Sequence, residues 1–136
     1  MRYLLQPIPF SVRAYSLPDL FAGKLHAVLF RKWGSRVKGR DWYDMVWFAG
    51  RHPSVSLTHL EQRMRQSGNW TEPKSLDAAD LRRLLLDAVA RLDIDQARAE
   101  VVPFVRDRRA LDVWSAGFFT DVIGRITPAS GTGDKP

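Results

Sequence analysis

The chain has 136 residues, of which 45% are hydrophobic, and this composition suits one folded domain and argues against global disorder. The absence of cysteine excludes disulfides and thiolate metal sites, and no apolar run is long enough to span a membrane. The N-terminal stretch lacks the long apolar centre of a signal peptide, so the sequence predicts a cytoplasmic protein.

The net charge of +6 is concentrated in the first part of the chain. Residues 1–54 carry nine Lys or Arg against three acids, whereas the remaining residues are balanced. A basic region attracts the phosphates of nucleotides and nucleic acids. Ordinary solubilising charge explains the excess equally well, so the charge alone does not decide between the two interpretations.

Extended structure is predicted at the N-terminus, where two prolines exclude a helix and side chains alternate. We expect a strand near Phe10–Ala14 and a shorter one before it. Ser16 is a typical N-cap for a helix over Leu17–Trp33 that ends at Gly34. Apolar periodicity and capping residues, such as Ser56 before residues 57–66, then predict five more helices, over Arg40–Gly50, residues 57–66, residues 76–92, Ile94–Val105 and residues 110–126.

The predicted fold class is therefore α+β and mainly helical, with one or two N-terminal strands followed by about six helices. We expect one domain over residues 1–126 and a disordered tail over residues 127–136, because the tail is rich in turn-forming residues and has no apolar anchor.

Two helices carry polar side chains in unexpected positions. On a helical wheel, Lys24 and Arg31 lie within the apolar face of the first helix, either because their charged ends reach solvent past buried stems or because the face borders a polar site. The second helix is apolar around most of its circumference and needs cover on several sides. Its polar arc, Arg40, Asp41 and Asp44, is either a solvated stripe with an Arg40–Asp44 pair or the edge of a site in which two carboxylates share a metal or a proton.

The connection between these helices is strongly basic. The ten residues "RKWGSRVKGR" hold five cations and no acid, and a tryptophan offers a stacking surface. Gly34 and Gly39 are expected to make this connection pliable. Lys32, Arg36 and Lys38 are therefore candidate contacts for phosphates or for a single-stranded nucleic-acid end.

The stretches "SLPDLFAGKLHAVLFRKW" and "RVKGRDWYDMVWF" resemble the AbiEii/AbiGii nucleotidyltransferase toxins of type IV toxin–antitoxin systems. The pattern K-L-x-A-x-x-x-R of that family is matched from Lys24 to Arg31, and its pattern R-D-x-x-D is matched from Arg40 to Asp44. The similarity runs from about Met1 to Val122.

This resemblance implies an enzyme that uses a nucleoside triphosphate (NTP) and Mg²⁺ to transfer a nucleotide to an acceptor, which for several relatives is tRNA. It implies that Lys24, Arg31 and Arg40 bind the nucleotide and that Asp41 and Asp44 support catalysis. It also implies a cognate antitoxin as a partner.

The sequence departs from the family pattern in one respect. The family has two earlier motifs, a Gly-Ser or Gly-Gly turn and a strand-borne acidic pair that holds the metal, and neither precedes Tyr15. The D-x-D formed by Asp93 and Asp95 lies at a helix boundary, where helix capping explains it. No metal ligand is therefore assigned, and the chain is expected to correspond to the C-terminal part of a nucleotidyltransferase-like fold and to be inactive alone.

Two further expectations follow from this departure. The alternative function is a non-catalytic helical module that binds RNA, a nucleotide or a protein partner. We also expect an exposed apolar surface near the N-terminal strand, which would associate with a separate N-terminal piece or with a second copy of the chain.

Overall fold

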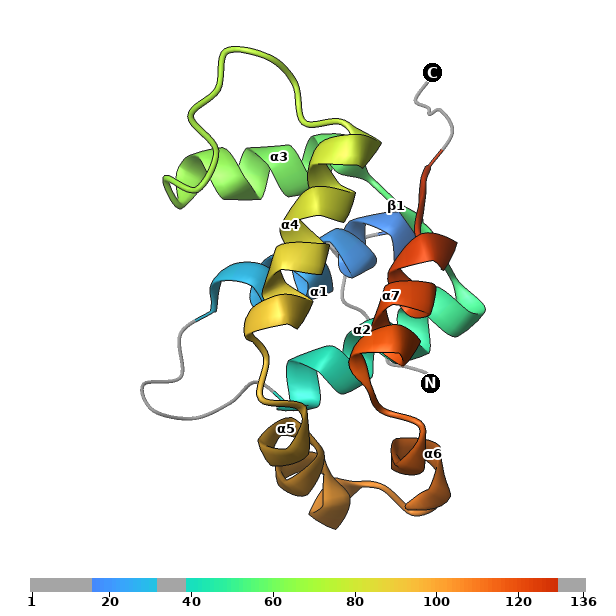
Figure 1. Ribbon diagram of the computed structural model, residues 1–136. Coiled ribbons are helices and arrows are strands. Elements are labelled where there is room, and N and C mark those ends of the chain that lie inside the picture. Colours follow the sequence, from blue (N-terminus) through green and yellow to red (C-terminus); the bar gives the residue numbers. More distant parts are fainter. Residues whose placement is uncertain (1–15, 32–38, 130–136) are drawn as a thin grey trace, which may run out of the picture.

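The computed structural model describes residues 16–31 and 39–129, which form a mainly helical fold (Figure 1). In chain order the elements are α1 Leu17–Phe30, α2 Gly39–Arg51, β1 Ser54–Val55, α3 Leu57–Gln66, α4 Ala78–Arg91, α5 Ile94–Val101, the 3₁₀ helix η1 Val102–Phe104, α6 Arg109–Asp112, α7 Ala116–Arg125 and β2 Thr127–Pro128. Within this part of the chain the sheet consists of β1 and β2, which pair in parallel with Ser54 opposite Thr127. The predicted class, α+β and mainly helical, is confirmed. The strands predicted before Tyr15 lie outside the described residues.

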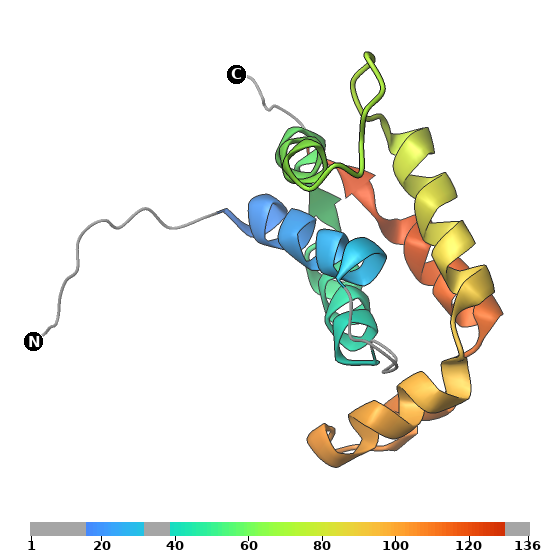
Figure 2. The same cartoon turned by 90° about the vertical axis from the view of Figure 1, so that its left-hand side faces the viewer.

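The helices form two layers (Figure 2). The first layer contains α1, α2 and α3, the second contains α4 and α7, and α5 lies across one end. Helix α1 packs against both α2 and α3, while α2 also contacts α5 and α7. The large side chains that are fully buried between these helices include Trp42, Phe21, Phe119, Leu25, Met45, Leu60, Met64 and Leu85.

Aromatic pairs fix α2 at the centre of this arrangement. The ring centroids of Trp42 and Phe119 lie 5.1 Å apart, as do those of Phe21 and Phe48. Such pairs contribute about 0.5–1.5 kcal/mol beyond the burial of their surface. The cover that the sequence demands around the second helix is thus supplied by α1, α5 and α7, although Trp47 remains 39% exposed.

Short polar side chains begin most of the helices. Ser16, Ser56, Asp77, Asp93 and Ser115 are N-caps, and each accepts a hydrogen bond from the backbone N–H three residues later. Because these N–H groups have no partner within the helix, the caps satisfy donors that would otherwise be lost. The capping roles expected for Ser16, Ser56 and Asp93 are confirmed.

The helix predicted over residues 110–126 is wrong, because the chain breaks it into α6 and α7. The guanidinium of Arg98 donates hydrogen bonds to the carbonyls of Leu111, at 3.1 Å, and Trp114, at 2.6 Å. These carbonyls are therefore bonded to a side chain of α5 at the place where the helix stops. Ser115 then starts α7 from an extended backbone conformation.

Four predicted boundaries also differ from the structure. Helix α1 ends at Phe30 and not at Trp33, with Arg31 in an extended conformation. Helix α4 begins two residues later than predicted because Asp77 caps it. The helix predicted to reach Val105 gives way to η1 around Pro103, which has no N–H to donate. The predicted tail begins with β2, where the N–H of Thr127 donates to the carbonyl of Pro53 at 3.0 Å, and residues 130–136 lie outside the described part.

Candidate functional site

Two ion pairs join α1 to α2. The Nζ atom of Lys24 lies 3.1 Å from Oδ2 of Asp44, and both side chains are partly exposed, at 44% and 41%. The chain thus brings together two residues that the sequence offered as candidates for a polar site. Because solvent reaches both partners, the pair can open when another charged group approaches.

The second pair is less accessible. Nη1 of Arg31 donates to Oδ1 of Asp41 at 3.2 Å, and the aspartate side chain is only 6% exposed while the arginine is 52% exposed. A buried carboxylate is tolerated when it is paired and hydrogen-bonded. This pair therefore holds α1 against α2 and keeps the partly exposed guanidinium of Arg31 in place.

The two pairs follow from the spacing of the residues. Lys24 and Arg31 are two helical turns apart, so these two cations lie on the same side of α1. Asp41 and Asp44 are about one turn apart, so these two carboxylates lie on the same side of α2. Since Lys24 meets Asp44 and Arg31 meets Asp41, the helices run in opposite directions along this contact. We call these four residues the α1–α2 ion-pair cluster.

Arg40 does not pair with Asp44 as the solvated-stripe interpretation expected. Its guanidinium carbon lies 4.6 Å from the ring centroid of Phe104 in η1, a cation–π arrangement. Arg40 is exposed, so its charge stays available to solvent at the edge of α2.

Gly39 sets the position of α2 on α5. A Cβ atom at this residue would lie 2.3 Å from the carbonyl oxygen of Ala97, and the backbone N–H of Gly39 donates to Oε1 of Glu100 at 3.1 Å. The sequence suggested a pliable connection at this glycine. The structure shows instead a close helix contact that a side chain would block.

The carboxylates near the cluster do not fit a Mg²⁺ site by themselves. Asp41 and Asp44 are each paired with a cation, and the described part of the chain contains no group of three or more His, Cys, Asp or Glu residues that could hold an ion. Mg²⁺ prefers several oxygen ligands in octahedral geometry. Asp93 caps α5 and Asp95 pairs with Arg98 at 2.8 Å, which confirms the structural interpretation of this D-x-D.

The half-exposed ammonium of Lys24, by contrast, suits an anionic ligand such as a phosphate. The basic residues Lys32, Arg36 and Lys38 lie outside the described residues, and their contact with nucleic acid stays a prediction.

A hollow of about 460 Å³ lies beside Arg31, between α1 and the end of α3. It is lined by Gly23, His26, Ala27, Phe30, Arg31, Arg63, Ser67 and Asn69. Sequence reasoning found Arg31 but missed the other polar residues of this hollow. The spacing i, i+4 and i+7 of Gly23, Ala27 and Phe30 shows that these residues share one face of α1. No pattern in the sequence, however, places Arg63 opposite that face.

A second hollow, of about 180 Å³, is lined mainly by apolar residues of α4, α7 and the two strands. None of the site residues predicted from the sequence lines it. Among the described residues, no helix has the length and apolar character needed to cross a membrane.

A protein-family model described as "Nucleotidyl transferase AbiEii toxin, Type IV TA system" matches residues 1–117. The match includes both α1 and α2, and hence every residue of the ion-pair cluster. No curated protein and no solved structure matches the chain.

Proposed function

The chain belongs to the AbiEii nucleotidyl transferase toxin family of type IV toxin–antitoxin systems. From this premise we propose that the chain binds a nucleoside triphosphate at the α1–α2 ion-pair cluster, for transfer of a nucleotide to an acceptor such as tRNA. The observation that carries the proposal is the direct pairing of Lys24 with Asp44 and of Arg31 with Asp41. Two sequence patterns that the family resemblance links to nucleotide chemistry thus meet at one place in the fold.

Lys24 is the proposed phosphate ligand. Its ammonium is a compact charge with three donors, and a triphosphate carries more negative charge than the single carboxylate that now holds it. A nucleotide would therefore displace Asp44 from Lys24 without breaking the buried pair. Arg31 within the cluster and the exposed Arg40, which precedes Asp41 in the sequence, contribute further positive charge.

In the proposed transfer, a hydroxyl oxygen of the acceptor bonds to the α-phosphorus while the bond from that phosphorus to pyrophosphate breaks. The hydroxyl proton must pass to a base, and Asp44 is the accessible carboxylate of the cluster. Asp41 is buried against Arg31 and serves as a positioning residue. The carboxylates described here do not make a Mg²⁺ site, so the ligands of that ion are assigned to none of them.

Two partner classes belong to this proposal. A cognate antitoxin is expected because the family is the toxin component of a two-part system. Nucleic acid is expected because the basic excess of the chain lies within its first 54 residues, which also contain the cluster.

The test is to incubate the purified 136-residue chain with tRNA, Mg²⁺ and each of the four α-labelled NTPs, and to measure both transfer and bound nucleotide. We expect the chain alone to bind a nucleotide but not to label tRNA, because the transfer step also needs a metal-holding acidic pair and the residues before Tyr15 contain none. Efficient labelling would refute the expected inactivity. Failure to bind any NTP would refute the nucleotide site and favour a non-catalytic module that binds RNA or protein.

A further inference from the structure

The hollow beside Arg31 has the size and lining of a ligand site. Its volume of about 460 Å³ lies within the range of roughly 300–1,000 Å³ that is usual for small-molecule pockets. Two arginines, one histidine, a hydroxyl and a carboxamide converge on it from α1, α3 and the loop that follows α3. Figure 1 shows these two helices side by side, with α3 above α1.

Positive charge dominates the hollow. Arg31 extends from the end of α1, and Arg63 lies in the last turn of α3. Within the described residues, the guanidinium of Arg63 has no carboxylate partner in any ion pair, so its charge is free to meet a ligand.

His26 lines the same hollow as these two cations and is hydrogen-bonded to Ser67. Its Nε2 atom lies 3.0 Å from Oγ of Ser67, whose hydroxyl proton can be donated to the carbonyl of Arg63 at 3.0 Å. Nε2 donates to Ser67 when it carries the ring proton and accepts from the Ser67 hydroxyl when it does not. Burial, and then the charges of Arg63 and Arg31, lower the pKa of His26 from its usual value of 6.5.

The hollow also has flat ring surfaces. The rings of His26 and Phe30 lie with their centroids 5.2 Å apart and their planes tilted by 54°, and both rings line the hollow. Rings of this kind accept the face of a nucleobase, and such stacking is largely independent of sequence. Cations and ring surfaces therefore lie together in one open site.

We propose that this hollow binds one phosphate-bearing nucleotide unit, with the phosphate between Arg31 and Arg63 and the base against His26 and Phe30. The unit is either a free mononucleotide or one nucleotide of a single strand. The inference deepens the proposed function, on which it rests for the choice of a nucleotide as ligand. The site itself is separate from Lys24.

The experiment follows the imidazole resonances of the three histidines by NMR while inorganic phosphate, AMP or a short single-stranded oligonucleotide is added. We expect AMP to shift the resonances of His26 and to raise its pKa, because a neighbouring phosphate favours the protonated ring. His52 and His59 serve as internal controls, since His52 packs on Trp47 and His59 lies near Asp19. Equal shifts at all three histidines would overturn the proposal.

The three probes separate the parts of the proposed ligand. AMP should bind at least about tenfold more tightly than inorganic phosphate if the ring surfaces contribute stacking. Equal affinities would refute a nucleotide unit. Tighter binding of the oligonucleotide than of AMP would identify a nucleotide of a single strand, and the reverse order would identify a free mononucleotide.

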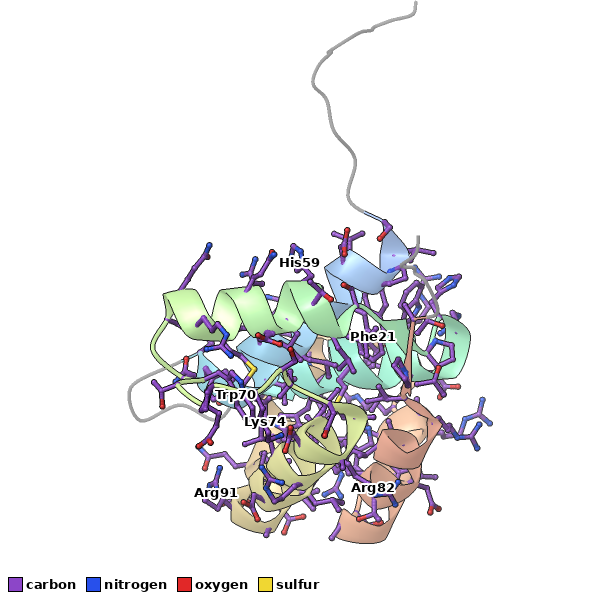
Figure 3. The ribbon with its side chains drawn as sticks, turned by 90° about the horizontal axis from the view of Figure 1, so that it is seen from above. Phe21, His59, Trp70, Lys74, Arg82 and Arg91 are labelled. Carbon is purple, nitrogen blue, oxygen red and sulfur yellow. The ribbon has the colours of Figure 1, made fainter. Side chains whose placement is uncertain are left out.

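A matched pair of variants tests the role of the cation. Arg63→Gln should weaken AMP binding by about tenfold or more, because it removes a charge-assisted hydrogen bond to the phosphate. Arg91→Gln is the control, since Arg91 is likewise an exposed arginine in the last turn of its helix, α4 (Figure 3). Equal affinities in the two variants would refute the site.

A third variant tests whether the hollow, which shares Arg31 with the α1–α2 ion-pair cluster, binds its ligand independently of Lys24. Lys24→Met should leave the AMP-induced shift of His26 unchanged while it weakens triphosphate binding at the cluster. Loss of the His26 shift in Lys24→Met would show that the hollow is not a separate site. Normal triphosphate binding in Lys24→Met, with the His26 shift intact, would instead refute only the proposed function of the cluster.

Discussion

Replacing Gly39 with alanine should destabilise the protein by separating α2 from α5. The new Cβ would lie 2.3 Å from the carbonyl oxygen of Ala97, 2.8 Å from Cγ2 of Val101 and 3.1 Å from Cβ of Glu100. The first of these atoms belongs to the backbone and cannot rotate away. The helices must therefore move apart by about 1 Å to restore ordinary contact distances of roughly 3.5 Å.

Overpacking of this kind costs about 1–3 kcal/mol. Alanine regains at most about 1 kcal/mol from its higher helix propensity, and less at the first residue of α2. The shift also strains the hydrogen bond from the N–H of Gly39 to Glu100. We therefore expect a net loss of about 1–2 kcal/mol, equivalent to a decrease in Tm of about 3–8 °C for a chain of this size.

The assay is thermal unfolding followed by circular dichroism, together with urea unfolding to obtain the free energy. Gly50→Ala is the matched control, because Gly50 lies in the same helix and a Cβ there meets no atom within 4 Å. A Gly39→Ala protein at least as stable as Gly50→Ala would show that the close contact with α5 does not exist in solution.

Two further predictions concern charged side chains. Lys74 and Asp80 form an ion pair, and hydrogen bonding to that lysine lowers the pKa of Asp80 to about 2 from its usual 3.8. A lowered pKa in the folded state contributes stability above about pH 4, and this stability is lost as the pH falls towards 2. Urea unfolding from pH 6 to pH 2 should therefore show a smaller acid-induced loss of stability for Asp80→Asn than for the wild type. An identical pH profile for the two proteins would refute this role of Asp80. Arg31→Gln should lower the free energy of unfolding by roughly 3 kcal/mol because it removes a charged partner of the buried Asp41, whereas Lys24→Gln should lower it by less than about 1 kcal/mol because that pair is exposed. Equal losses in these two variants, measured in urea, would contradict the different burial of the two pairs.

Local rules predicted much of the helical framework from the sequence. Ser16 and Ser56 begin helices where capping chemistry places them, and the end of α2 lies within one residue of its predicted position. The wheel positions of Lys24 and Asp44 marked both residues as candidates for a polar site, and the structure pairs them. These features depend on residues within a few turns, and the sequence shows such residues directly.

Features that depend on distant residues could not be predicted in this way. The break before α7 involves Arg98, which lies in another helix and bonds the carbonyls of Leu111 and Trp114. The pairing of β1 with β2 joins segments that are more than seventy residues apart in the sequence, and each strand is only two residues long. Such short strands have no alternation to detect, and the backbone partner alone defines them.

The loop before α4 shows a similar limit. The guanidinium of Arg65 donates to the carbonyls of Glu72 and Lys74, and the indole N–H of Trp70 donates to the latter as well. Figure 3 shows Trp70 and Lys74 together beside α4. The sequence indicated a loop here, but its ordered backbone depends on a side chain from α3.

The hollow beside Arg31 was missed for the same reason. Each of its polar residues has an ordinary role when it is considered in its own segment, such as an exposed arginine at a helix end. Only the packing of α1 against α3 brings His26 and Arg63 to the same place.

Lys24 is proposed to bind the phosphates of a nucleotide in place of Asp44. The affinity of an NTP for three variants of the chain tests this role most directly. Calorimetric titration should show that Lys24→Met weakens NTP binding by about tenfold or more, while Arg91→Gln leaves it unchanged. Asp44→Asn should bind the NTP as tightly as the wild type or more tightly, because it removes the carboxylate that competes for Lys24 at 3.1 Å. Wild-type affinity in Lys24→Met, or equal weakening in Lys24→Met and Asp44→Asn, would contradict the account.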